Sequence, residues 1–82
     1  MSIVTYKVGE GIYSFSTKLQ IKQFIDMLAL ETLLIDEIKN HKKDNGIEGI
    51  IHDVTIKDDS GLTASAKDFR KPSVSLELKN VE

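Results

Sequence analysis

The stretch that decides the fold is residues 16–45, STKLQIKQFIDMLALETLLIDEIKNHKKDN. It contains neither proline nor glycine, and its apolar residues recur at three- and four-residue spacing, as in an amphipathic helix. Thr17, with a glutamine three residues later, matches a capping box, and Asn45 and Gly46 tolerate the left-handed turn that ends many helices. The sequence therefore predicts one helix over Thr17–Lys43, about 40 Å long at roughly 1.5 Å per residue.

This helix has more apolar surface than one sheet needs. One stripe is typical of a core-facing side and consists of Ile21, Phe24, Ile25, Leu28, Thr32 and Ile35. A second row lies beside it and consists of Met27, Leu30, Leu33, Leu34 and Ile38. The combined arc exceeds the roughly 100° that packing on one sheet requires. We therefore expect the first stripe to form the core and the second row to form a two-fold homodimer interface. The alternative is that the last strands of the chain cover the second row within one subunit.

Strands are predicted on both sides of the helix, because apolar and polar residues alternate there. The predicted strands are residues 2–8, 12–16, 47–57, 62–69 and 73–79. Gly9-Glu10-Gly11 is typical of a hairpin loop and Asp58–Gly61 of a turn, while Gly49 suggests a bulge. The order β-β-α-β-(β)-β indicates an α+β fold, in which an antiparallel sheet of four to five strands packs on one long helix.

The same alternation predicts which strand residues face the core. They are Val4, Tyr6, Val8, Tyr13, Phe15, Ile50, His52, Val54, Ile56, Val74, Leu76 and Leu78. Strands of this length reach roughly 20–26 Å at about 3.3 Å per residue. The longer helix is therefore expected to overhang the sheet with the part that carries Leu30, Leu33, Leu34 and Ile38.

Composition limits the classes of protein that need consideration. A chain of 82 residues with 40% hydrophobic and 29% charged residues is typical of a single folded domain, residues 1–82. Cysteine is absent, which excludes disulfides and thiolate metal sites. The net charge of −2 argues against a nucleic-acid partner. No apolar run reaches the roughly 18 residues of a membrane span, and a signal peptide is not evident, so we expect a cytoplasmic protein.

No pattern in the sequence indicates catalysis, a cofactor or a metal. His52 and Asp53 are neighbours in a predicted strand, so their side chains should point to opposite faces and share no ligand. We therefore expect His52 to be structural and half-buried. Asp58 and Asp59 lack the alternating oxygen ligands of a calcium-binding EF-hand loop.

Positive charge gathers at the end of the predicted helix. The residues concerned are Lys39, His41, Lys42 and Lys43, with Arg70 and Lys71 as further members. This group is a candidate patch for an acidic partner. The simpler interpretation is that these cations stabilise the helix end through its dipole, with His41 in a capping role.

These observations predict a small, non-enzymatic, homo-oligomeric interaction protein that acts by binding another macromolecule, most simply a protein. Two alternatives stay open: a small-molecule-binding protein with weak hydrolytic chemistry near His52, and a structural subunit of a larger assembly such as a virion or secretion device. In size and composition the chain is similar to accessory proteins of phages and mobile elements.

Overall fold

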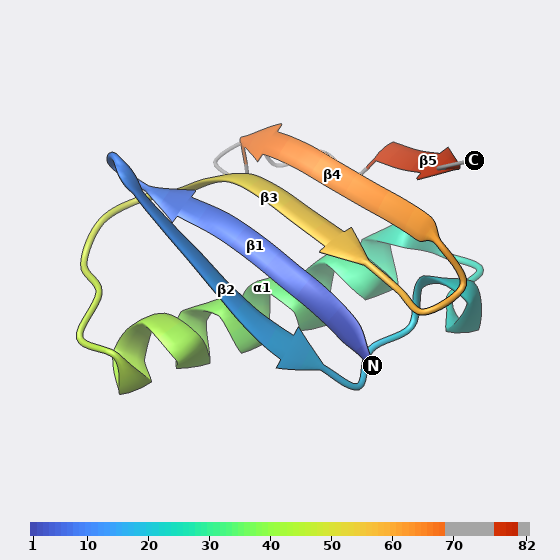
Figure 1. Ribbon diagram of the computed structural model, residues 1–82, viewed down its shortest axis with the longest axis horizontal. Coiled ribbons are helices and arrows are strands. Elements are labelled where there is room, and N and C mark those ends of the chain that lie inside the picture. Colours follow the sequence, from blue (N-terminus) through green and yellow to red (C-terminus); the bar gives the residue numbers. More distant parts are fainter. Residues whose placement is uncertain (69–76, 81–82) are drawn as a thin grey trace.

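The computed structural model describes residues 1–68 and 77–80 of the chain. Five strands form one antiparallel sheet in the order β2-β1-β3-β4-β5, and a single long helix crosses one face of it (Figure 1). The elements are β1 (Ser2–Val8), β2 (Gly11–Thr17), η1 (Ile21–Gln23, a 3-10 turn), α1 (Met27–Asp44), β3 (Ile51–Lys57), β4 (Leu62–Asp68) and β5 (Glu77–Asn80). The predicted α+β fold is confirmed. In the described part of the chain, no helix has the length and apolar character needed to cross a membrane.

The helix begins at Met27, so the predicted start at Thr17 was wrong. Thr17 instead ends β2, where it pairs with Ser2 across the hairpin, and its hydroxyl donates to Glu37 Oε1 at 2.6 Å. The N-cap is Asp26, whose carboxylate accepts from the backbone N–H of Leu28 at 2.9 Å. At 18 residues, or about 27 Å, α1 is close to the strands in length, and the predicted overhang is also wrong.

The end of the helix agrees with the sequence. Gly46 adopts a φ of 65°, and its N–H donates to the Lys43 carbonyl at 3.3 Å. The N–H of Ile47 donates to the Lys42 carbonyl at 2.9 Å. Together these two bonds form a Schellman motif, which requires a residue that accepts left-handed backbone without strain.

The helix faces the sheet with the row that we expected to be a dimer interface. Leu30, Leu34 and Ile38 are completely buried in the core of one chain, whereas Leu28 keeps 50% of its surface exposed. The predicted orientation was therefore wrong, and these three side chains are not available to a second subunit. The cause is the late start of α1, because Ile21, Phe24 and Ile25 belong to the connection and do not extend the other stripe.

The other members of the two rows are divided between the core and the surface. Ile21 is buried, Phe24, Met27 and Ile35 are half-buried, and Ile25, Thr32 and Leu33 are exposed. The row Leu30-Leu34-Ile38 has a four-residue spacing that produces a straight ridge, which packs on β1 and β3. The sheet covers this ridge within one chain, and the strands β3 and β4, which follow the helix in sequence, contribute to that core.

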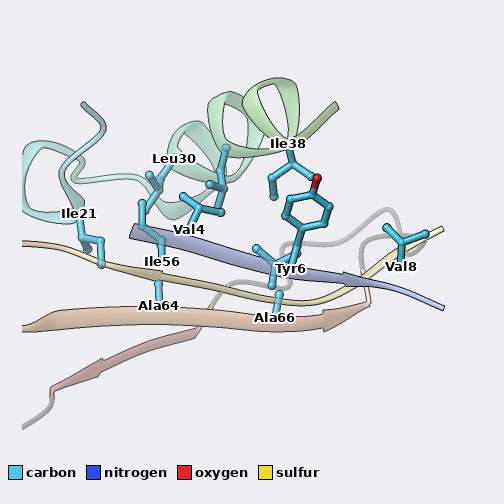
Figure 2. Close-up of a cluster of buried hydrophobic side chains, with 11 residues drawn as sticks. Val4, Tyr6, Val8, Ile21, Leu30, Ile38, Ile56, Ala64 and Ala66 are labelled. Carbon is cyan, nitrogen blue, oxygen red and sulfur yellow. The ribbon is translucent and has the colours of Figure 1, made fainter. Parts of the chain in front are cut away.

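The strands supply the other half of the core. Val4, Tyr6 and Ile56 are completely buried and point toward α1, as predicted (Figure 2). Val54 is completely buried in the same core. The β4 strand adds two small buried side chains, Ala64 and Ala66. Tyr13 and Phe15 are half-buried against the cluster. Val8 is also buried as expected, but Ile50 is exposed, contrary to the prediction. Val74 and Leu76 lie outside the described residues, and the register pairs Leu78 with Ala64.

The irregularity between β1 and β3 occurs at Asp53 rather than at Gly49. The register shifts between Thr5 and Lys7, and Asp53 adopts a φ of 50°, which marks a β-bulge. Gly49 precedes the strand with a φ of 131°, and a Cβ added there would lie 2.5 Å from Val8 Cγ1. Gly49 therefore permits a close approach of the incoming chain to β1.

Candidate interaction surface

Among the described elements, none covers the face of the sheet opposite α1 (Figure 1). Along β1 and β2 its residues alternate with the buried ones, and the register aligns Ser14, Thr5, Thr55 and Ser65 in one row across β2, β1, β3 and β4. The hydroxyls of Thr5 and Ser14 lie 3.2 Å apart. Beside this row, Ile3 and Ile12 are exposed at 49% and 64%. We call this surface the open face, defined by Ile3, Thr5, Ile12, Ser14, Thr55 and Ser65.

The β2 edge is the second distinctive surface. β2 ends the strand order, so only one of its sides is paired by the described residues. Its seven residues, GIYSFST, pair regularly with β1 and include no charge and no proline. Natural sheets usually protect such an edge with lysine, proline, a bulge or a short strand. Among the described strands the opposite edge is β5, which has four residues and includes Glu77 and Lys79.

His52 pairs with Lys7 of β1 and with Asp68 of β4. Its Nδ1 is 3.2 Å from Asp53 Oδ2, and its Nε2 is 3.1 Å from the Gly9 carbonyl oxygen. Lys7 Nζ approaches the same carboxylate oxygen at 3.7 Å. The expected separation of His52 from Asp53 was wrong, because the bulge at Asp53 interrupts the alternation of side chains. Both ring nitrogens have internal partners, so His52 connects the first hairpin turn to β3.

His41 points into the protein and not into a surface patch. Its Nδ1 lies 2.6 Å from the Tyr6 hydroxyl oxygen, and the Phe15 ring stacks on it with a centroid distance of 4.8 Å. Burial, and to a lesser extent the neighbouring Tyr13, raise the pKa of Tyr6 above its ordinary value of 10.0. Tyr6 therefore keeps its proton at neutral pH.

The candidate basic patch is divided by these contacts. Lys42 donates to the Gly49 carbonyl at the flank of α1, while Lys39 and Lys43 are exposed one turn apart on its outer side. Arg70 and Lys71 lie outside the described residues. Within the described part of the chain, the structure thus brings together two of the six predicted members as a free basic pair.

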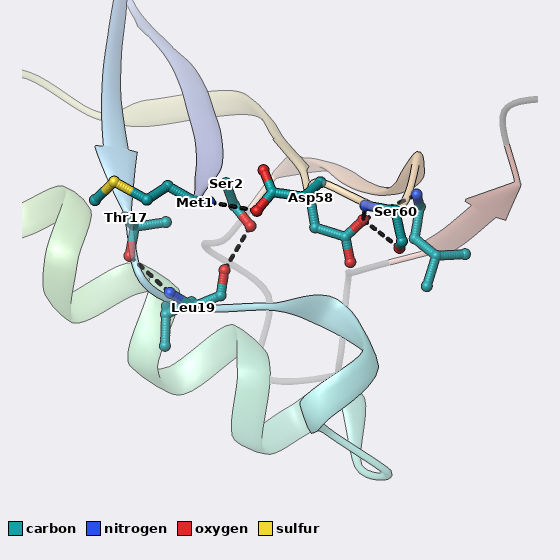
Figure 3. Close-up of polar contacts among 8 residues, drawn as sticks. Met1, Ser2, Thr17, Leu19, Asp58 and Ser60 are labelled. Atoms are coloured by element: carbon teal, nitrogen blue, oxygen red, sulfur yellow. Dashed lines mark hydrogen bonds and ion pairs between the residues drawn. The ribbon is translucent and has the colours of Figure 1, made fainter.

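The turn between β3 and β4 is held by Asp58 (Figure 3). Its Oδ1 accepts from the N–H of Ser60 and of Leu62, both at 3.0 Å, and from the Ser60 hydroxyl at 2.6 Å. Burial alone would raise the pKa of Asp58, but these hydrogen bonds and the charge of Lys22 lower it below its ordinary value. The predicted turn chemistry is confirmed. Among the described residues, no three His, Asp or Glu side chains gather as a metal site would require.

The N-terminus is attached to the same end of the sheet. The amino group of Met1 pairs with the Asp59 carboxylate, and the buried Ser2 hydroxyl donates to the Leu19 carbonyl at 2.5 Å. The Leu19 N–H in turn donates to Thr17 Oγ1 at 3.2 Å (Figure 3). These contacts hold the connection between β2 and η1 against the first residue of β1.

Comparison with protein-family models, with curated proteins and with solved structures finds no match to this chain. The function is therefore inferred from the surfaces of this chain.

Proposed function

We propose that this protein is a small, non-enzymatic interaction protein that binds another macromolecule through the open face. The observation that carries the proposal is the exposure of Ile3 and Ile12 beside a row of hydroxyl side chains on a sheet face that the helix leaves bare. Aliphatic side chains can anchor a partner, while serine and threonine hydroxyls satisfy its polar groups. The row itself contains no charge, and charged residues are depleted at the centre of protein interfaces.

The small-molecule alternative relied on His52 as a free polar group. In the structure its two ring nitrogens lie within hydrogen-bonding distance of Asp53 and Gly9, and the other histidine, His41, is engaged by Tyr6. Both rings therefore serve contacts within the fold. These contacts favour the interaction protein over the small-molecule alternative.

The proposal is tested by blocking the open face. Thr55→Arg places a large cation at the centre of the row, and Asn40→Arg places the same group on the exposed outer side of α1 as a matched control. Tagged full-length chains are used to capture partners from the native host, and the bound proteins and nucleic acids are quantified. We expect a partner that binds wild type and Asn40→Arg but is lost with Thr55→Arg. Retention by Thr55→Arg, or loss with both variants while both stay folded by circular dichroism, contradicts the proposal.

A further inference from the structure

We propose that a second copy of this chain pairs with the β2 edge. The two β2 strands would run antiparallel about a two-fold axis at Ser14, and the two five-stranded sheets would join into one of ten strands. This inference goes beyond the proposed function because it uses the outward backbone groups of β2, whereas the proposed function uses side chains of the open face. Each proposal can therefore fail without the other.

Backbone groups on the outer side of β2 are oriented to pair with another strand. The hairpin has a two-residue turn, Gly9-Glu10, flanked by the paired residues Val8 and Gly11. In such a hairpin the flanking pair is hydrogen-bonded, and hydrogen-bonded pairs then recur at every second residue. The backbone N–H and C=O groups of Ile12, Ser14 and Ser16 consequently point away from β1. They form a row of three donor–acceptor positions along the edge.

This row of donor–acceptor positions is self-complementary. A two-fold axis at Ser14 pairs Ser14 with its own copy and Ile12 with Ser16, so the three outward positions of each strand meet those of the other. On the helix side of the sheet, Tyr13 is then opposite Phe15, an aromatic pair of the kind that stabilises antiparallel strands. Both rings are half-buried in one chain, so they have surface left to contribute.

The charges at the two ends of β2 are complementary between two copies. Glu10 and Lys18 flank β2, both are exposed, and they lie at equal distances in sequence from Ser14. The two-fold register places Glu10 of each copy opposite Lys18 of the other, at both ends of the interface. Moving the axis to Tyr13 or to Phe15 would place Glu10 opposite Ser16, or Lys18 opposite Ile12, and would pair fewer residues. The charges therefore favour the register centred on Ser14.

A second copy fits this edge better than an unrelated strand because the same seven residues supply both sides of the contact. A two-fold contact is closed, so it leads to a dimer and does not propagate into a fibre. It also covers the unprotected edge of both chains.

The register can be tested with single cysteines, because the chain has none of its own. Directly opposed residues of a hydrogen-bonded pair have Cα atoms about 5.5 Å apart, which is within the range of a disulfide. Ser14→Cys should therefore form a disulfide-linked dimer under mild oxidation. Ser16→Cys is the matched control on the same exposed face of the strand, but its two copies would lie about 13 Å apart along the strands. We expect dimers of Ser14→Cys on non-reducing gels and monomers of Ser16→Cys; equal cross-linking of both, or of neither, overturns the proposal.

The oligomeric state gives an independent test on the full chain. Light scattering at tens of micromolar should show a dimer for wild type and for Ser14→Thr. Ser14→Pro should be monomeric, since proline removes an N–H that points outward and is tolerated on an edge strand. A monomeric wild type, or a Ser14→Pro variant that remains dimeric, overturns the proposal. If Ser14→Pro does not fold, the cysteine pair decides the question. Partner capture is scored separately with Thr55→Arg, so failure of the dimer is distinguishable from failure of the open-face proposal.

Discussion

The two faces of the sheet carry similar numbers of residues but have different roles. The covered face is apolar and completely buried at Val4, Tyr6 and Ile56, whereas the open face presents hydroxyls at Thr5 and Thr55. Burial against α1 supplies the free energy that holds the fold together, because removing apolar surface from water is the dominant favourable contribution. The open face is consequently free of this packing constraint. Substitutions should thus be costly on one face and cheap on the other.

The largest effect is expected at the centre of the covered face. Leu34→Ala should lower the free energy of unfolding by about 2–5 kcal/mol, because it leaves a cavity beneath the sheet. The matched control is Leu28→Ala on the same helix, which is half-exposed and should cost less than about 1 kcal/mol. Urea denaturation of both variants measures the difference. Equal midpoints would show that α1 does not face the sheet as described.

The next largest loss of stability is expected from substitution of a glycine at the margin of the covered face. Gly49→Ala forces a left-handed backbone onto alanine and a Cβ against Val8, and should destabilise by about 1–3 kcal/mol. Gly46→Ala is the control, because its φ is also positive but nothing lies within 4 Å of the added carbon. It should cost only the left-handed strain, about 1–2 kcal/mol, and therefore less than Gly49→Ala, which has the contact with Val8 in addition. A Gly49→Ala variant as stable as Gly46→Ala would contradict the close approach to Val8.

The hydrogen bond between Tyr6 and His41, within the covered face, should contribute less to the free energy of unfolding. Tyr6→Phe removes the hydroxyl that meets His41 Nδ1 at 2.6 Å and should cost about 0.5–1.5 kcal/mol, the usual net value of such a bond. Thermal unfolding of Tyr6→Phe beside His41→Phe and the double variant completes a double-mutant cycle. A coupling energy near zero would mean that the two side chains do not interact in solution.

The turn between β3 and β4 is expected to make a pH-dependent contribution to the free energy of unfolding. The folded-state pKa of Asp58 lies below its ordinary value of 3.8, so its carboxylate stabilises the fold above about pH 4. This contribution is lost as the pH falls through the folded pKa. The free energy of unfolding, measured from pH 5 to pH 2, should therefore fall more steeply for wild type than for Asp58→Asn. Parallel curves would show that Asp58 does not contribute to acid unfolding.

The smallest effect belongs to the open face. Thr5→Val deletes a hydroxyl contact with Ser14 on an exposed surface and should change the free energy of unfolding by no more than about 0.5 kcal/mol. The same variant in the capture experiment should weaken partner binding if Thr5 contacts the partner. A loss of more than 2 kcal/mol would place Thr5 in the structural core and end the distinction between the faces.

Local patterns in the sequence predicted the fold class, the first hairpin and the helix end. The inward residues of β1 follow from alternation within one strand, and Gly46 ends α1 through bonds to nearby carbonyls. The hairpin loop was placed correctly but is shorter than expected, because Gly11 already pairs with Val8.

The start and orientation of α1 could not be predicted from the same local rules. Thr17 has a good capping pattern, but pairing with Ser2 across the sheet, a contact distant in sequence, keeps it in β2. Asp26 ahead of the uninterrupted Leu30-Leu34-Ile38 row was the signal that indicated both the true start and the true core face.

The polar contacts depended even more on distant residues. Tyr6 and His41 are 35 positions apart. The bulge that brings His52 and Asp53 together is made by Asp53 itself, a residue that does not signal a bulge in the sequence as a glycine would. The β2 edge is different, since its lack of charge and its flanking Glu10 and Lys18 are visible in the sequence. What the sequence did not show is that β2 is the outer strand.

The strand order also has a consequence for synthesis of the chain on the ribosome. β1 lies between β2 and β3, yet β3 begins at Ile51, 34 residues after β2 ends at Thr17. At roughly 5–20 residues per second, the nascent hairpin waits about 2–7 s before its inner partner has been made. Before α1 is complete at Asp44, the apolar side of the hairpin, with Val4 and Tyr6, lacks the helix that covers it, and the edge of β1 stays unpaired until β3 follows. Translation speed across the helix codons therefore sets how long this nascent hairpin is open to chaperones or to aggregation.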